Sequence, residues 1–135
     1  MSASSDYLEN KLLDHTLGGS TFSQPGTLYL GLFTNDSTNA ASNLEAGTLT
    51  DEVSGGSYAR KAITFGAASG GSASSSATVT FDSATANWGT ITHVAVMDAS
   101  TSGEVLFYGA VTTSKTIESG DTFQVSSGNL TISLA

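Results

Sequence analysis

The feature that most constrains this chain is a change of hydrophobic period directly after Pro25 and Gly26. In the stretch TLYLGLFT, residues 27–34, successive apolar side chains alternate between two faces. A period of two is typical of a β-strand. Because both faces of this strand are apolar, we expect it to lie in the middle of its sheet.

More strand patterns follow at intervals of about 8 to 12 residues, with turn formers such as Ser119-Gly120-Asp121 between them. They are predicted at residues 57–65, 77–81, 89–99, 103–111, 115–117, 121–126 and 129–135. Short strands at this spacing are typical of an antiparallel sandwich or barrel. The sequence therefore predicts a mainly β fold, an antiparallel β-sandwich or jelly-roll-like single domain over residues 1–135, with strands from about residue 27 to residue 134.

Two segments lack the strand pattern. Residues 35–56 hold many turn formers and few large apolar groups, which predicts a long surface loop with at most a short strand at Thr48–Leu49. Residues 66–76 are rich in Gly, Ala and Ser and predict a flexible connector.

One segment ahead of the strands has the helical period. A helix is predicted at about residues 6–17, where Asp6 and Glu9 have the spacing of a capping box and Gly18-Gly19 supplies a left-handed stop. Three turns are too short to be stable alone in water, so the helix must pack on something.

The leucines of this helix are its candidate contacts. Leu8, Leu12 and Leu13 are predicted to form one buried apolar side and are candidate interface residues. The helix either covers an open end of its own subunit, which we favour, or docks into a neighbouring copy.

Charge and composition argue against several classes of binding partner. The net charge is −8, and the largest basic cluster is the pair Arg60-Lys61, which disfavours direct binding of nucleic acid. The chain has no cysteine and therefore no disulfide or thiolate metal site. Its apolar runs are far shorter than the ~18 residues of a membrane span, so no membrane partner is expected.

No motif for chemistry emerges from the chain. His15 lies near the helix end and His93 inside a strand pattern with Ile91, Ala95 and Met97 on its expected face, so both histidines are interpreted as structural. Neither a nucleophile elbow nor a calcium-loop spacing occurs. We expect no catalytic, cofactor-binding or metal-binding residue, no cofactor, and no enzymatic activity.

Three more residues are candidates for an interface. Trp88 is interpreted as a core anchor in preference to an exposed contact. Tyr58 and Arg60 alternate to one face, where they form either an exposed hot spot or an edge strand whose Arg60 pairs with a nearby acid. The sequence does not separate these two readings.

The order of segments resembles the short β-rich virion structural proteins of tailed bacteriophages, which are described as tail-fibre-like or capsid decoration proteins. The resemblance covers nearly the whole chain and is clearest at residues 12–15, 28–34, 58–60, 88–93 and 119–121. It implies a virion component that is made in the cytoplasm of the bacterial host, and it brings no catalytic residues.

Position on the particle is the open question. A free-standing fibre needs repeats or coiled coil, which this chain lacks, so the favoured function is a multi-copy capsid decoration or cement protein. The alternative is a tail-fibre or tail-tip module that contacts the host, and a remote alternative is a carbohydrate-active enzyme. Expected partners are copies of itself, with a trimer among the forms considered, and other virion proteins such as the major capsid protein. A host-surface glycan is a partner only under the tail-fibre alternative.

Overall fold

The computed structural model describes residues 3–134, and the strand and helix bounds are those of that range. The elements follow one another as β1 (Ala3–Ser4), α1 (Asp6–Leu17), β2 (Leu28–Phe33), α2 (Ala40–Glu45), β3 (Lys61–Ile63), β4 (Ser72–Ser74), β5 (Val79–Thr80), β6 (Gly89–Met97), β7 (Val105–Ile117), β8 (Gln124–Val125) and β9 (Thr131–Ser133).

Five strands form the main antiparallel sheet, in the order β1-β7-β6-β2-β3. Strand β2 pairs with β3 on one side and with β6 on the other, which confirms its predicted central place. Its period of two divides its side chains between the two faces of the sheet: Leu30 and Leu32 enter one core, and Phe33 enters the other.

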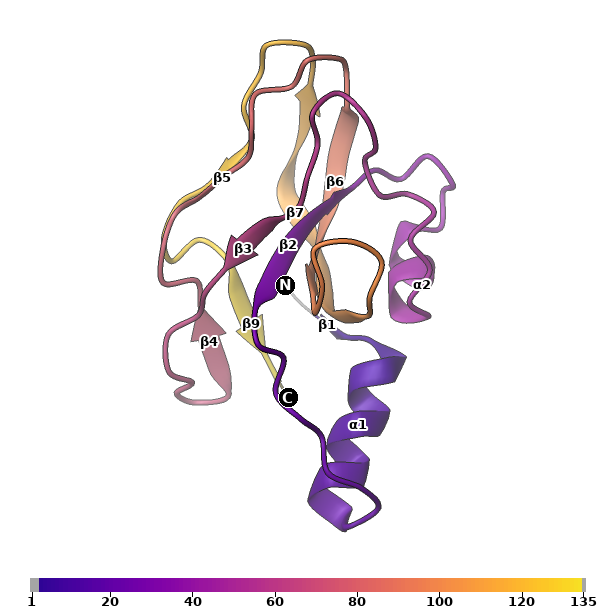
Figure 1. Cartoon of the computed structure of the whole chain (residues 1–135), viewed down its shortest axis with the longest axis vertical. Coiled ribbons are helices and arrows are strands. Elements are labelled where there is room, and N and C mark those ends of the chain that lie inside the picture. The colour runs from indigo at the N-terminus through magenta and orange to yellow at the C-terminus, as the bar shows by residue number, and fades with distance from the viewer. Residues whose placement is uncertain (1–2, 135) are drawn as a thin grey trace.

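Two separate cores lie on the two faces of this sheet. The larger core is covered by two small sheets, β5-β8 and β4-β9, and the smaller core by α2 (Figure 1). The larger core contains Leu30, Leu32, Val53, Ile63, Val79, Phe81, Ala84, Trp88, Ile91, Ile117 and Phe123. The mainly β, antiparallel, sandwich-like fold is thus confirmed, whereas its jelly-roll form is not.

Several strands are shorter or longer than predicted. The predicted strands at 103–111 and 115–117 are a single strand, β7, because the Thr- and Ser-rich residues between them also take extended backbone. The connector at 66–76 contains β4, which pairs with β9. Strand β1 was not predicted.

A large bulge interrupts the pairing of β6 with β7. His93 lies opposite Ala110 and Ile91 lies opposite Lys115, so Thr92 faces four residues of β7, namely 111–114. The alternation of β6 side chains also changes at this irregularity in the pairing. Ile91 enters the larger core while Ala95 and Met97 enter the smaller one, so the predicted common face of these three residues with His93 is wrong.

The bulge lies next to an open edge. Strand β1 pairs with β7 only at Phe107 and Tyr108, and within residues 3–134 no strand pairs with β7 on that side beyond Tyr108.

The segment 35–56 is not simply a surface loop. It forms α2, whose Ala40 and Leu44 are buried at the spacing i, i+4, and the predicted strand at Thr48–Leu49 is absent. The Asp51 carboxylate is also buried and accepts hydrogen bonds from the Ser37 backbone N–H at 3.1 Å and from the Ser37 hydroxyl at 2.5 Å. Side-chain bonds of this kind order the segment.

Helix α1 has the predicted bounds but a different cap. Ser5, not Asp6, is the N-cap, and its Oγ accepts from the Leu8 N–H at 3.3 Å. Ser5 is fully buried because it also pairs with β7, donating its backbone N–H to the Leu106 carbonyl at 2.9 Å. Gly18 ends the helix in the left-handed conformation, at φ 92°. From this anchored start the helix projects beyond the sheet at the lower end of the molecule (Figure 1).

Candidate functional site

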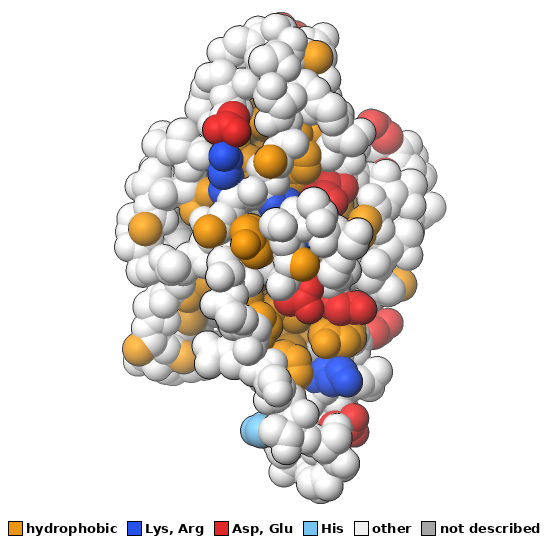
Figure 2. Space-filling view, viewed as in Figure 1, with side chains coloured by type: hydrophobic (Ala, Val, Ile, Leu, Met, Phe, Trp, Pro, Cys, Tyr) orange, Lys and Arg blue, Asp and Glu red, His pale blue; other side chains and the backbone are white. Residues whose placement is uncertain are grey.

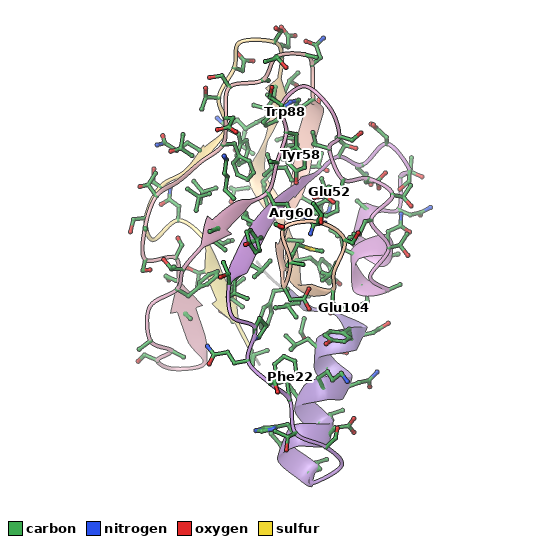
Figure 3. All side chains as sticks on the ribbon, viewed as in Figure 1. Phe22, Glu52, Tyr58, Arg60, Trp88 and Glu104 are labelled. Carbon is green, nitrogen blue, oxygen red and sulfur yellow. The ribbon has the colours of Figure 1, made fainter. Side chains whose placement is uncertain are left out.

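The structure brings Tyr58 and Arg60 together around Glu52 (Figure 3). Arg60 holds the carboxylate in a two-pronged ion pair, with Nε to Oε2 and Nη2 to Oε1 both at 2.7 Å. The paired fork geometry is the strongest form of this interaction. Arg60 is only 7% exposed, so the pair is largely withdrawn from solvent.

Arg60 also fastens the connection between β6 and β7. Its Nη1 donates to the carbonyl oxygens of Ala99 at 2.8 Å and of Ser102 at 2.7 Å. Burial alone would lower the pKa of Arg60, but the hydrogen bond and charge of Glu52 outweigh it and raise the pKa above its ordinary value. The reading in which Arg60 pairs with a nearby acid is confirmed.

Tyr58 completes the group. Its hydroxyl donates to Glu52 Oε2 at 2.7 Å and accepts from the Leu32 backbone N–H at 3.0 Å. Burial, and then the negative charge of Glu52, raise the pKa of this phenol far above its ordinary range. The hydroxyl therefore stays protonated and serves as a structural bridge. A role of Tyr58 and Arg60 in an intermolecular interface stays a prediction.

Trp88 is a core residue, as favoured from the sequence. It is 5% exposed, and its indole Nε1 donates to the Gly56 carbonyl at 2.9 Å. Its ring meets Tyr58 edge to face at 5.5 Å between centroids, a favourable aromatic geometry. Gly56 has φ +57°, and a Cβ there would come within 2.9 Å of the indole nitrogen, so this close approach requires glycine.

Both histidines make local hydrogen bonds, and their interpretation as structural residues stays a prediction. His93 Nδ1 lies 2.9 Å from the Thr92 hydroxyl, and burial lowers the pKa of His93 although the charge of Asp51 partly opposes this. His15 Nδ1 accepts from the Phe22 backbone N–H at 3.1 Å and so ties the chain after α1 back to the helix.

Residues 3–134 contain no group of three or more His, Cys, Asp or Glu side chains arranged to hold a metal ion. In the same range no helix is long and apolar enough to cross a membrane.

The candidate leucines of α1 do not share one environment. Leu8 is 4% exposed and Leu12 is partly buried, but Leu13 is 55% exposed. The prediction of buried contacts is therefore confirmed for Leu8 and wrong for Leu13 within one subunit. The helix packs on its own subunit through its first half, as favoured, while its second half projects.

A feature that the sequence did not reveal lies where α1 meets the sheet, and we call it the apolar hollow. It consists of two adjoining lobes that share Phe107 and Leu134. The first lobe is closed by α1 and by Phe22, and the second by β4 and Phe65. Figure 2 shows hydrophobic side chains at this junction of the body with the projecting helix. Its walls come from distant segments, and local periodicity carries no signal for such a surface.

Glu52, Arg60 and Tyr58 are thus paired with one another inside the subunit, and none of them is left free in an open cleft. The family described as podophage GP4 fiber I protein gp80 matches residues 3–133. The chain belongs to this family of phage fibre proteins, so it is a structural component of the virion and is made in the host. The resemblance to phage virion proteins is thus confirmed. Comparison with curated protein sequences gave no match.

Proposed function

We propose that the protein is a module of a tail fibre rather than a decoration of the capsid. The observation that carries this proposal is the match of the fibre family to residues 3–133, nearly the whole chain. This family description favours the tail-fibre alternative over the decoration function that composition and shape had favoured.

The fold supports a particular part of a fibre. A shaft needs repeats, coiled coil or intertwined strands, whereas residues 3–134 form a sheet with two cores and a projecting helix. The protein therefore serves as a compact joint or tip that other virion proteins extend. In this role residues 1–135 act as one domain.

The proposed role needs no catalysis. Glu52 is paired with Arg60, and the Tyr58 hydroxyl is held in its protonated form. Neither group is free to act as a nucleophile or a general base at neutral pH. Partners are other virion proteins and further copies of the chain, and a glycan of the host surface is the ligand class for a tip position.

Labelling of intact particles tests the position. An epitope tag at the C-terminus, detected with gold-conjugated antibody in electron microscopy, should mark the tail region and only a few sites per particle. A tag on the major capsid protein is the control and should mark the head. Label distributed over the head in hundreds of copies would contradict the proposal and restore capsid decoration.

Particles that lack the protein test the role. We expect them to adsorb poorly to host cells while they retain DNA during heating as well as wild-type particles do. Normal adsorption together with early loss of DNA would contradict the tail-fibre function. Supplying the gene in trans is the control and should restore adsorption.

A further inference from the structure

Helix α1 has two apolar sides, and only one of them has a partner. At 100° per residue, Leu13 and Leu17 lie on the side opposite to Leu8. Leu8 is 4% exposed, whereas Leu13 is 55% and Leu17 is 79% exposed. A helix that is apolar on two opposite sides is typical of one buried on both. We call Leu13 and Leu17 the outer stripe.

The apolar hollow has room for such side chains. Its two lobes have cavity volumes of about 250 and 330 Å³. An apolar cavity of about 150 Å³ accepts a group the size of benzene, so each lobe has space for a leucine side chain. Neither lobe is lined by an Asp, Glu, Lys or Arg residue.

Charge makes this end suitable for contact between copies. A chain of net charge −8 repels its own copies, so a contact between copies is most favourable where both surfaces lack charge. The hollow meets this condition, and the segment from Thr16 to Ser20 has no charged residue of its own, so that Asp14, which lies against Gly19, is the nearest charge to Leu17 at this end. In the part of the chain that the structure describes, three large hydrophobic residues are more than half exposed, namely Leu13, Leu17 and Leu134, and all three lie at this end.

The outer stripe cannot fill the hollow of its own subunit. Leu8 and Leu12, on the inner side of α1, already form a wall of the first lobe. The outer stripe points away from that wall because it lies across the helix. Only the hollow of another molecule is accessible to it.

We propose that the outer stripe of one copy inserts into the apolar hollow of a neighbouring copy. The two surfaces differ, so the contact is heterologous, and repetition of such a contact closes a ring when the rotation allows it. The proposal commits to a second copy because one chain carries both complementary surfaces at the same end. It goes beyond the proposed function and does not depend on where the protein sits on the particle.

Directed cross-linking tests the pairing. The chain has no cysteine, so single cysteines can be placed at will. Leu17→Cys copies mixed with Ala68→Cys copies should give a mixed cross-linked dimer with a short bifunctional maleimide, because Ala68 lines the second lobe. Leu17→Cys mixed with Thr112→Cys, on the open edge of β7, is the matched control and should give none. A product containing only Leu17→Cys copies, or no product with Ala68→Cys, would overturn the proposal.

Oligomeric state provides a second test on the full chain. Light scattering coupled to gel filtration should show a closed oligomer of the wild type at micromolar concentration. The double variant Leu13→Gln, Leu17→Gln should raise the dissociation constant at least tenfold with an unchanged circular dichroism spectrum, because both positions are exposed in one subunit. A monomeric wild type would overturn the proposal.

A control separates this surface from the edge of β7. The double variant Thr112→Gln, Thr113→Gln also changes two exposed residues and should leave the oligomer intact. Dissociation of this control with an intact Leu13→Gln, Leu17→Gln oligomer would identify the open edge as the interface and refute the insertion.

Discussion

The region around Arg60 and the end of the molecule that carries α1 differ in one respect. Side chains around Arg60 are bonded to other groups of the same subunit, whereas two leucine side chains of α1 are largely exposed. Arg60 donates four hydrogen bonds within its own subunit, to Glu52, Ala99 and Ser102. At the other end, Leu13 and Leu17 remain exposed beside an open apolar hollow. A buried charge must be paired within the subunit because an unpaired buried charge is costly. An exposed apolar side chain costs less, so it can remain exposed in the free subunit and become buried only when copies associate. The comparison suggests that the Arg60 region maintains the fold and the α1 end serves assembly.

The strongest test of this division is Arg60→Met. It leaves Glu52 without its cation and two carbonyl groups without a donor, and breaking a buried pair in this way costs about 3–5 kcal/mol. Urea denaturation should show that loss in the free energy of unfolding. The neighbouring Lys61→Met is the control, because Lys61 pairs with Asp82 at 3.0 Å in an exposed setting and should lose less than about 1 kcal/mol. A loss for Arg60→Met as small as that of the control would refute the structural role.

The second test compares the two sides of α1. Leu8→Ala should cost about 2–5 kcal/mol because it empties a packed site. Leu17→Ala should change the free energy of unfolding by no more than about 0.5 kcal/mol, as expected for a surface position. Both are measured by denaturation at low protein concentration, where contacts between copies do not contribute. Equal losses would show that the two sides of the helix do not differ.

Tyr58→Phe should have a smaller effect. It removes the acceptor of the Leu32 N–H and the donor to Glu52, and an unsatisfied buried group costs about 1–3 kcal/mol. Thermal unfolding followed by circular dichroism should show the decrease. If the variant melts like the wild type, the hydroxyl bridge does not contribute to stability.

The smallest effect concerns pH. The pKa of His93 is lowered by burial, so below its ordinary pKa near 6.5 the unfolded chain binds the proton more readily than the folded one. Stability should therefore fall as the pH drops below about 6.5 towards the folded pKa. His93→Gln should make the denaturation midpoint less dependent on pH between 7.5 and 5.5. A steeper dependence in this variant would reverse the assigned direction.

The sequence predicts elements whose signal is local. Strand β2 alternates clearly, and α1 has leucines at helical spacing with a glycine stop, so both were located within one or two residues. Helix α2 was missed because it has six residues and its N-cap Asn39 makes no side-chain capping bond. Its stability comes from burying Ala40 and Leu44 against the sheet, and a local pattern does not contain that contact.

For the candidate site, too, the sequence did not predict contacts between residues that are distant along the chain. The alternation of Tyr58 and Arg60 predicted a shared face and left an acidic partner as one of two alternatives, and it did not indicate that Glu52 would be the acid. Ser5 replaced Asp6 as the cap because its backbone and hydroxyl also bond to β7, a contact set by the fold. The apolar hollow joins segments as distant as Phe22 and Leu134, and only tertiary structure brings them together.

The bulge in β7 has a consequence for behaviour in the crowded host cell. An open strand edge is a template on which other chains can add as strands, which leads to uncontrolled growth of sheets. Residues 111–114 interrupt the regular pattern of backbone groups on this edge, and bulges of this kind are one of the ways in which natural sheets prevent such growth. A virion protein accumulates as free subunits before particles form. The irregular edge of β7 therefore helps the free subunits to avoid amyloid-like aggregation until they are incorporated into particles.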